Sequence, residues 1–189
     1  MNEEVKVDPR VERTKVRVLE ATRALLVEGG QAGISHSALA ARAGVGRATL
    51  YRHWPRLDQL FAELIADLGD RFEIEMVGDL GTDLRAALHS MAVLFSSPEG
   101  RIPIIAAIER AQRSDDTARQ LMSVLGSTTA ARRVLDRALI QGQLSAHVDL
   151  DLATSLLLGP VMHRAFMTPV PVDAAFIDAI VDTFLASHG

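Results

Sequence analysis

The sequence predicts an all-α fold of about nine helices, in which a three-helix N-terminal domain precedes a helical C-terminal domain. Alanine and leucine dominate a composition that is 48% hydrophobic and only 4% aromatic, which favours helices over sheets. Apolar residues recur at helical spacing, and glycine or proline clusters separate the recurring runs. The length of 189 residues suffices for a sizeable hydrophobic core.

The first helix is predicted from about Arg10 to Glu28, where apolar residues mark one face of the helix. Gly29 and Gly30 follow this pattern and are expected to end the helix, because glycine readily adopts the backbone conformations that stop it.

Two short helices joined by a glycine are predicted in the stretch HSALAARAGVGRATLYRHW, which begins at His36. Ser35 or Ser37 caps the first of them, which ends at Gly44, where a left-handed backbone is expected. The second runs from about Arg47 to Trp54. This arrangement describes a helix-turn-helix, and an ordinary helical hairpin within a bundle is the alternative.

The rest of the chain is predicted to form a helical body. Proline, glycine and serine clusters divide it into helices at about 55–76, 83–95, 102–112, 116–141, 150–167 and 173–187. We therefore expect a helix-turn-helix domain at residues 10–55 and a second domain at residues 56–189, joined through the helix that begins near residue 55.

Charge is distributed unevenly along the sequence. Residues 9–57 contain nine basic and three acidic residues, a net charge of +6, and because the whole chain carries −4 the remainder carries −10. A basic head on an acidic body suits a local contact with a polyanion, although chance clustering would give the same count.

Other classes of function lack sequence support. The absence of cysteine excludes disulfide and thiol chemistry, and no signal peptide or membrane-spanning run is visible, so we expect a cytoplasmic protein. The six histidines never lie three or four residues apart, and no phosphate loop, HExxH or GxSxG motif occurs. We predict that the protein is not an enzyme and binds neither metal nor cofactor.

The helix after the glycine turn has the side chains of a DNA-reading helix. Arg47 could pair with guanine, and the small residues Gly46 and Ala48 would let the helix approach base edges. Side chains that can donate hydrogen bonds to phosphate, or add positive charge, are Ser35, Thr49, Tyr51, Arg52, His53 and Arg56. A solvated helix face is the alternative for each, and we expect Trp54 to pack in the core.

The segment VLEATRALLVEGGQAGISHSALAARAGVGRATLYRHWPRLDQL resembles the N-terminal domain of the TetR family of bacterial transcriptional regulators, above all in AGV and TLYRHW. The resemblance implies that the helix from Arg47 reads the major groove and that Ser35, Tyr51 and His53 contact phosphate. The family often has lysine where this chain has Leu57, and whether Arg56 replaces that lysine is open.

Helix-turn-helix repressors bind DNA as two-fold dimers, so we expect a homodimer on a palindromic operator. The two C-terminal helices are the candidates for the interface, and the TetR resemblance implies that they build it. The residues expected there are Leu156, Leu157, Met162, Phe176, Ile180 and Phe184, and burial within one chain's own core is the alternative.

The resemblance also implies a small-molecule effector that binds the body and lowers the affinity for DNA. We expect an apolar or amphipathic effector in a cavity near Met91, Phe95, Ile108, Met122, Met162, His163 and Phe166, although such residues are often plain core. Repression is the more frequent role in the family, and activation stays open. The alternative function is a small-molecule-binding or interaction protein whose helix-turn-helix lacks a specific operator.

Overall fold

The computed structural model describes residues 9–71, 73–113, 115, 118–119 and 129–188, and within these ranges every regular element is helical. The elements are α1 (Pro9–Gly29), the 3-10 turn η1 (Gln31–Gly33), α2 (His36–Ala43), α3 (Arg47–His53), α4 (Leu57–Arg71), α5 (Leu80–Ser96), α6 (Pro98–Ala111), α8 (Ala130–Ile140), α9 (Leu150–Met167) and α10 (Ala174–His188). The all-α prediction is confirmed.

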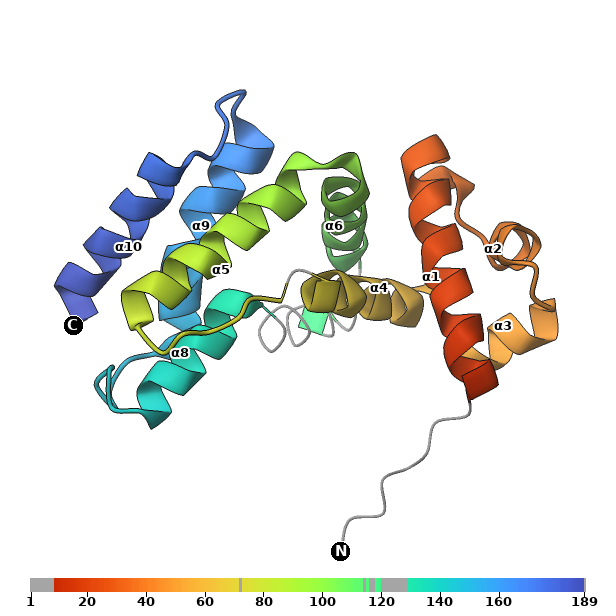
Figure 1. The fold of residues 1–189 in the computed structure, drawn as a ribbon. Coiled ribbons are helices and arrows are strands. Elements are labelled where there is room, and N and C mark those ends of the chain that lie inside the picture. The colour runs from red at the N-terminus through yellow and green to blue at the C-terminus, as the bar shows by residue number, and fades with distance from the viewer. Residues whose placement is uncertain (1–8, 72, 114, 116–117, 120–128, 189) are drawn as a thin grey trace, which may run out of the picture.

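The helices gather at two ends of the molecule. Figure 1 shows α1, α2 and α3 at one end, α5, α8, α9 and α10 at the other, and α4 and α6 between them. Fully buried leucines occur in all three places: Leu39 and Leu50 in the N-terminal group, Leu60 in α4, and Leu88 and Leu135 in the C-terminal group. One connected hydrophobic core therefore extends from the N-terminal head into the body.

The helix predicted to continue toward Met76 ends earlier, because α4 stops at Arg71 and residues 73–79 are not helical. The backbone of residues 76–78 bonds to other elements in place of a continued helix. The Met76 carbonyl accepts a hydrogen bond from Arg137 of α8 at 3.4 Å. This non-helical connection joins α4 to the body along α8.

The next helix begins earlier than the predicted Asp83. The carboxylate of Asp79 caps α5 by accepting a hydrogen bond from the Thr82 backbone at 2.8 Å. Asp83 is buried within the first turn, where its carboxylate accepts the backbone N–H groups of Val77 and Gly78 at 2.8 and 3.0 Å. Asp83, which was predicted to begin the helix, therefore binds the end of the preceding connection to α5.

α6 also begins before the predicted Ile102. Pro98 occupies its first turn, where a missing N–H costs nothing, and the Ser97 hydroxyl caps it by accepting a hydrogen bond from Gly100 N at 3.2 Å.

Among the described helices none is by itself long and apolar enough to cross a membrane. The pair α5 and α6, bent by 89°, reaches that length and apolar composition only when the two helices are taken together.

The single helix predicted from Asp116 to Gln141 is not continuous. Thr129 has an extended backbone (φ −69°, ψ 137°), and its hydroxyl accepts a hydrogen bond from Arg132 N at 3.3 Å to begin α8. Residues 116–117 and 120–128 of the predicted helix lie outside the described residues.

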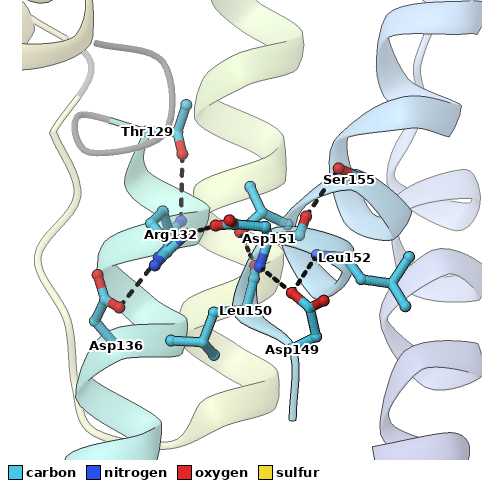
Figure 2. A network of polar contacts seen from close by, with 9 residues as sticks. Thr129, Arg132, Asp136, Asp149, Leu150, Asp151, Leu152 and Ser155 are labelled. Carbon is cyan, nitrogen blue, oxygen red and sulfur yellow. Dashed lines mark hydrogen bonds and ion pairs between the residues drawn. The ribbon is translucent and has the colours of Figure 1, made fainter. Parts of the chain in front are cut away.

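The start of α9 is fixed against α8 by a polar network (Figure 2). Arg132 donates to Asp136 on its own helix and to Asp151 on α9, and these two hydrogen bonds raise the pKa of its guanidinium. Asp149 caps α9 by accepting the backbone N–H groups of Asp151 and Leu152 at 2.9 and 3.0 Å. The network joins the first turn of α9 to α8, next to the buried residues of both helices.

Candidate nucleic-acid interface

The turn between α2 and α3 has the geometry that the sequence predicted. Gly44 has a left-handed backbone with φ 62° and ψ 41°, and it ends α2. Arg17 of α1 reaches this turn, where its guanidinium donates to the carbonyl oxygens of Ala43 and, at 2.8 Å, Gly44. Sequence reasoning missed this role, because nothing in the local pattern relates Arg17 to a turn 26 residues further along the chain.

The inner side of the two helices packs into the core. Leu39 and Ala43 of α2 and Leu50 of α3 are buried. Trp54, directly after α3, is also buried, as expected for an anchor of this small domain. Because these contacts fix α3 on one side, its opposite side is held outward as a rigid surface.

That outward surface consists of the residues predicted to contact DNA. Thr49 is half-buried, and the exposed residues of α3 are Arg47, Ala48, Tyr51, Arg52 and His53. Among the described residues, neither Arg47 nor Arg52 has an ion-pair partner within the chain. The surface therefore presents two positive charges and several hydrogen-bond donors to solvent.

Ser35 caps a helix, and this role is compatible with the predicted contact with phosphate. It caps α2, where its hydroxyl oxygen accepts the Ala38 backbone N–H at 3.1 Å. A serine hydroxyl has one donor in addition to its acceptor lone pairs. The O–H of exposed Ser35 can therefore still donate to a phosphate.

His36, which the sequence analysis did not single out, lies beside Tyr51. The two rings are stacked, with centroids 4.1 Å apart and planes at 11°. The Nε2 of His36 lies 2.8 Å from the carbonyl oxygen of Trp54. No local pattern could reveal this contact, since the two residues belong to different helices.

The corner where the family often has lysine is occupied by an ion-pair cluster. Arg56 pairs with Asp58 at 3.1 Å, and the same carboxylate accepts a hydrogen bond from Arg110 Nε of α6 at 3.0 Å and forms an ion pair with its Nη2 at 2.9 Å. The guanidinium of Arg110 also lies 4.6 Å from the ring centre of Phe61 on α4. Asp58 therefore forms ion pairs with both Arg56 and Arg110 of α6.

A second contact joins α6 to the N-terminal head. The side-chain amide of Gln31 in η1 donates to the carbonyl oxygen of Ala106 and to the carboxylate of Glu109, both at 2.7 Å. The C-terminal half of α6 therefore contacts the head at η1 and α4 at Asp58. α6 is therefore joined by side-chain hydrogen bonds both to the head and to α4.

Several residues predicted to line an effector cavity come together in the body. Met91 and Phe95 are buried on α5, and Phe166 of α9 is half-buried. The rings of Phe95 and Phe166 lie 5.0 Å apart at 52°, an edge-tilted contact common among buried aromatic residues. Phe95 and Phe166 thus form an apolar contact between α5 and α9, and Met91 belongs to the same hydrophobic core.

The other predicted cavity residues are placed differently. Ile108 and Met162 are half-buried and pack against the core. His163 is exposed on α9, and Met122 lies outside the described residues. Within the described part of the chain no group of three or more histidine, aspartate or glutamate side chains could hold a metal ion.

The residues predicted for the dimer interface divide by exposure. Leu156 on α9 is 50% exposed, and Phe176 and Ile180 on α10 are half-buried. Leu157 and Phe184 are buried in the core of their own subunit, at 0% and 5% exposure. Their burial matches the alternative of packing within one chain.

Comparison with known proteins agrees with this geometry. A family model described as "Bacterial regulatory proteins, tetR family" matches residues 18–64. A second, described as "Tetracyclin repressor-like, C-terminal domain", matches residues 74–184, which is more than half of the chain.

Individual relatives cover nearly the whole chain. YdeS of Bacillus subtilis strain 168, an HTH-type transcriptional regulator, is 24% identical over 180 residues, spanning 93% of this chain and 90% of YdeS. AqdR of Rhodococcus erythropolis, another HTH-type regulator, is 25% identical over 152 residues, or 80% and 73% of the two chains. The crystal structure of the TetR-family regulator SCO0332 is 29% identical with a TM-score of 0.72, covering 92% of this chain and 97% of that one.

Proposed function

Because the chain belongs to the TetR family of transcriptional regulators, we propose that it binds a palindromic operator as a homodimer and releases it when a small molecule enters the body. The sequence-based assignments to this family, and to regulators in place of enzymes, are confirmed by the matches. The operator, the effector and the dimer are the parts that we propose.

The exposed side of α3 is the observation that carries the proposal. It presents Arg47, Tyr51, Arg52 and His53 on a short helix whose other side is buried. Arg47 in the first turn suits a bidentate contact with guanine, worth about 1–3 kcal/mol of base discrimination. Tyr51, His53 and the Ser35 hydroxyl suit contacts with phosphate oxygens, which hold the helix in register without reading sequence.

The exposed side of α9 supports the proposed homodimer. Residues spaced by three and four place one stripe along this helix: Leu152, Leu156, Gly159, His163 and Met167, all of them exposed. None of the five is a carboxylate, lysine or arginine, and a Cβ built on Gly159 would meet no atom within 4 Å. A stripe that is apolar except for His163, with an open position at Gly159, suits close approach of the same helix from a second copy.

The interface proposed here therefore differs in part from the residues first expected. Leu156, Phe176, Ile180 and Met162 stay in it, since each is at least partly exposed on α9 or α10. Leu157 and Phe184 leave it, because a side chain packed in its own subunit's core has no surface to offer a partner. His163 moves from the proposed cavity to this interface.

Effector binding is proposed at the apolar contact between α5 and α9, near Met91, Phe95 and Phe166. A ligand there would favour one placement of α6, which packs on α5, contacts α4 through Arg110 and contacts the head through Gln31. A ligand that prefers one spacing of the two recognition helices shifts the dimer toward that spacing and changes its affinity for DNA. Repression relieved by an apolar or amphipathic molecule is the proposed outcome.

Selection of bound duplexes from a random DNA pool tests the proposal. The expected result is a palindromic consensus bound at least about 10³-fold more tightly than random duplex at the same salt concentration. Equal affinity for selected and random DNA would contradict it and would favour an interaction protein with a degenerate helix-turn-helix. The pairing of Arg56 with Asp58, next to the missing lysine at Leu57, is the observation that favours this second candidate.

A further inference from the structure

His36 is held between the two helices of the motif by two contacts of different kinds. It is the first residue of α2, and its ring lies against the ring of Tyr51 on α3, nearly parallel and 4.1 Å away. The edge of the imidazole meets the end of α3, where Nε2 lies 2.8 Å from the Trp54 carbonyl oxygen.

The second contact fixes the position of a proton on the imidazole. A carbonyl oxygen only accepts hydrogen bonds, so Nε2 must carry the hydrogen that it donates to Trp54. Trp54 is itself buried and ends α3 through its backbone N–H to Leu50 O at 2.8 Å. The imidazole is therefore anchored to a rigid point and cannot rotate without losing this hydrogen bond.

Tyr51 gains order from this arrangement. Its side chain is 53% exposed, and an exposed side chain ordinarily samples several rotamers. Stacking on an anchored ring restricts the phenol to one of them before any DNA is present. The conformational entropy of ordering Tyr51 is then lost on folding and not on binding.

We infer that His36 is a positioning residue for the DNA contact, holding the Tyr51 phenol where its O–H meets a phosphate oxygen of the duplex. The inference rests on the proposed function, since the phosphate belongs to the proposed operator. His36 itself acts through Tyr51, and it does so from a helix that precedes the recognition helix.

Three substitutions at His36 separate the stack from the hydrogen bond. His36→Ala removes both, His36→Phe keeps an aromatic ring without the donor, and His36→Gln keeps a donor without the ring. We expect His36→Ala and His36→Gln to weaken binding to every duplex about 2- to 10-fold, the range for one side chain ordered on binding. We expect His36→Phe to lose less, at most about 2-fold, because its ring still stacks on Tyr51 although the hydrogen bond that anchors the imidazole is gone.

A spectroscopic signature separates positioning from a general loss of structure. Tyr51 is the only tyrosine of the chain, so ring-labelled tyrosine gives one set of NMR signals. In the parent protein and in His36→Phe these signals should show the shift caused by a stacked ring, and in His36→Ala and His36→Gln they should not. Thermal unfolding of each variant identifies any that fails to fold, and the His36→Phe and His36→Gln pair then decides the question.

A double-mutant cycle tests whether His36 acts through Tyr51. In a Tyr51→Ala background, His36→Ala should cost no further affinity for DNA. The matched control is His53→Ala, because His53 is exposed on α3 without stacking on Tyr51, and its effect should add to that of Tyr51→Ala.

Two results would overturn the inference. The first is that His36→Ala lowers the affinity for DNA equally in the parent protein and in the Tyr51→Ala background. The second is that a His36 variant loses the stacking shift of the Tyr51 signals but keeps the parent's affinity for DNA. If the parent protein prefers no duplex and responds to no change at Tyr51, the proposed function itself fails. The stacking shift, which is measured without DNA, separates that outcome from an error about His36.

Discussion

Two exposed helical faces of this molecule, one on α3 and one on α9, differ in what they present to solvent. The face of α3 carries Arg47, Tyr51, Arg52 and His53. The face of α9 carries a stripe centred on Gly159 that is apolar except for His163, with no carboxylate, lysine or arginine among its five residues. Both helices bury their other side in the same hydrophobic core.

The difference indicates two kinds of partner. Positive and hydrogen-bonding side chains with no ion-pair partner gain most from a polyanion such as duplex DNA. Exposed leucine and methionine gain most from removal of water by another apolar surface. One face therefore suits nucleic acid and the other a second copy of the chain, as a dimeric DNA-binding regulator requires.

The largest expected effect comes from changing neighbouring leucines of α9. Leu157→Glu would place a carboxylate in the core and cost at least about 3 kcal/mol of unfolding free energy, whereas Leu156→Glu would leave the fold intact. Circular dichroism during thermal unfolding measures this contrast, and sedimentation should show folded monomers for Leu156→Glu. A folded dimer of Leu156→Glu would place the interface elsewhere.

The next largest effect is expected on base recognition. Arg47→Ala should lower the preference for one base in each half-site by about 1–3 kcal/mol, because it removes a bidentate contact. Selection of bound DNA from a random pool compares the two preference profiles, and the variant should remain dimeric. If the profiles were identical, Arg47 would not read a base.

A smaller effect is expected from removing one hydroxyl group. Tyr51→Phe keeps the ring on His36 but removes the phosphate donor, which should cost about 0.5–1.5 kcal/mol of binding to every sequence alike. Titration against the selected and a scrambled duplex measures the two losses. A loss limited to the selected duplex would assign Tyr51 to base recognition.

The smallest effect concerns the exposed ion pair between α1 and α2. Arg42 donates hydrogen bonds to Glu28 and lowers the pKa of this carboxylate below its ordinary value of 4.5. The unfolded chain then binds a proton at higher pH than the folded chain. The contribution of Glu28 to stability is therefore fully present above the unfolded pKa and is lost as the pH falls through the lowered pKa of the folded state.

The corresponding measurement is the urea midpoint of the parent protein and of Glu28→Gln between about pH 6 and pH 3. The two urea midpoints should differ slightly near about pH 6 and converge as the pH falls toward about 3. A difference that stays constant across this range would mean that the pair with Arg42 does not depend on ionisation of Glu28.

The head was largely predictable because local rules determine it. Ser35 caps the start of α2, and Gly44 ends this helix with the left-handed backbone that the turn needs. Trp54 lies four residues after Leu50, and both are buried. The stack of His36 on Tyr51 was not predictable, since both residues are polar positions on different helices and meet only in three dimensions.

The body was less predictable because its sequence offers fewer contrasts. α9 is apolar nearly all round, so periodicity could not tell inward-facing Leu157 from outward-facing Leu156. The polar network of Arg132 and Asp151 joins two helices and leaves no local pattern. The end of α4 was missed because the backbone of residues 76–78 bonds to Asp83 of α5 and Arg137 of α8, which no local pattern reveals.

The most direct test of the two-face account is the spacing of the half-sites in the selected operator. A dimer joined through α9 holds its two α3 helices at a fixed distance, which for helix-turn-helix dimers is about 34–36 Å, one duplex turn. Inserting about five base pairs, half a turn, at the operator centre should reduce the affinity of the full chain to that for random DNA. Unchanged affinity for the lengthened operator would contradict the account, because each α3 would then read DNA without its partner.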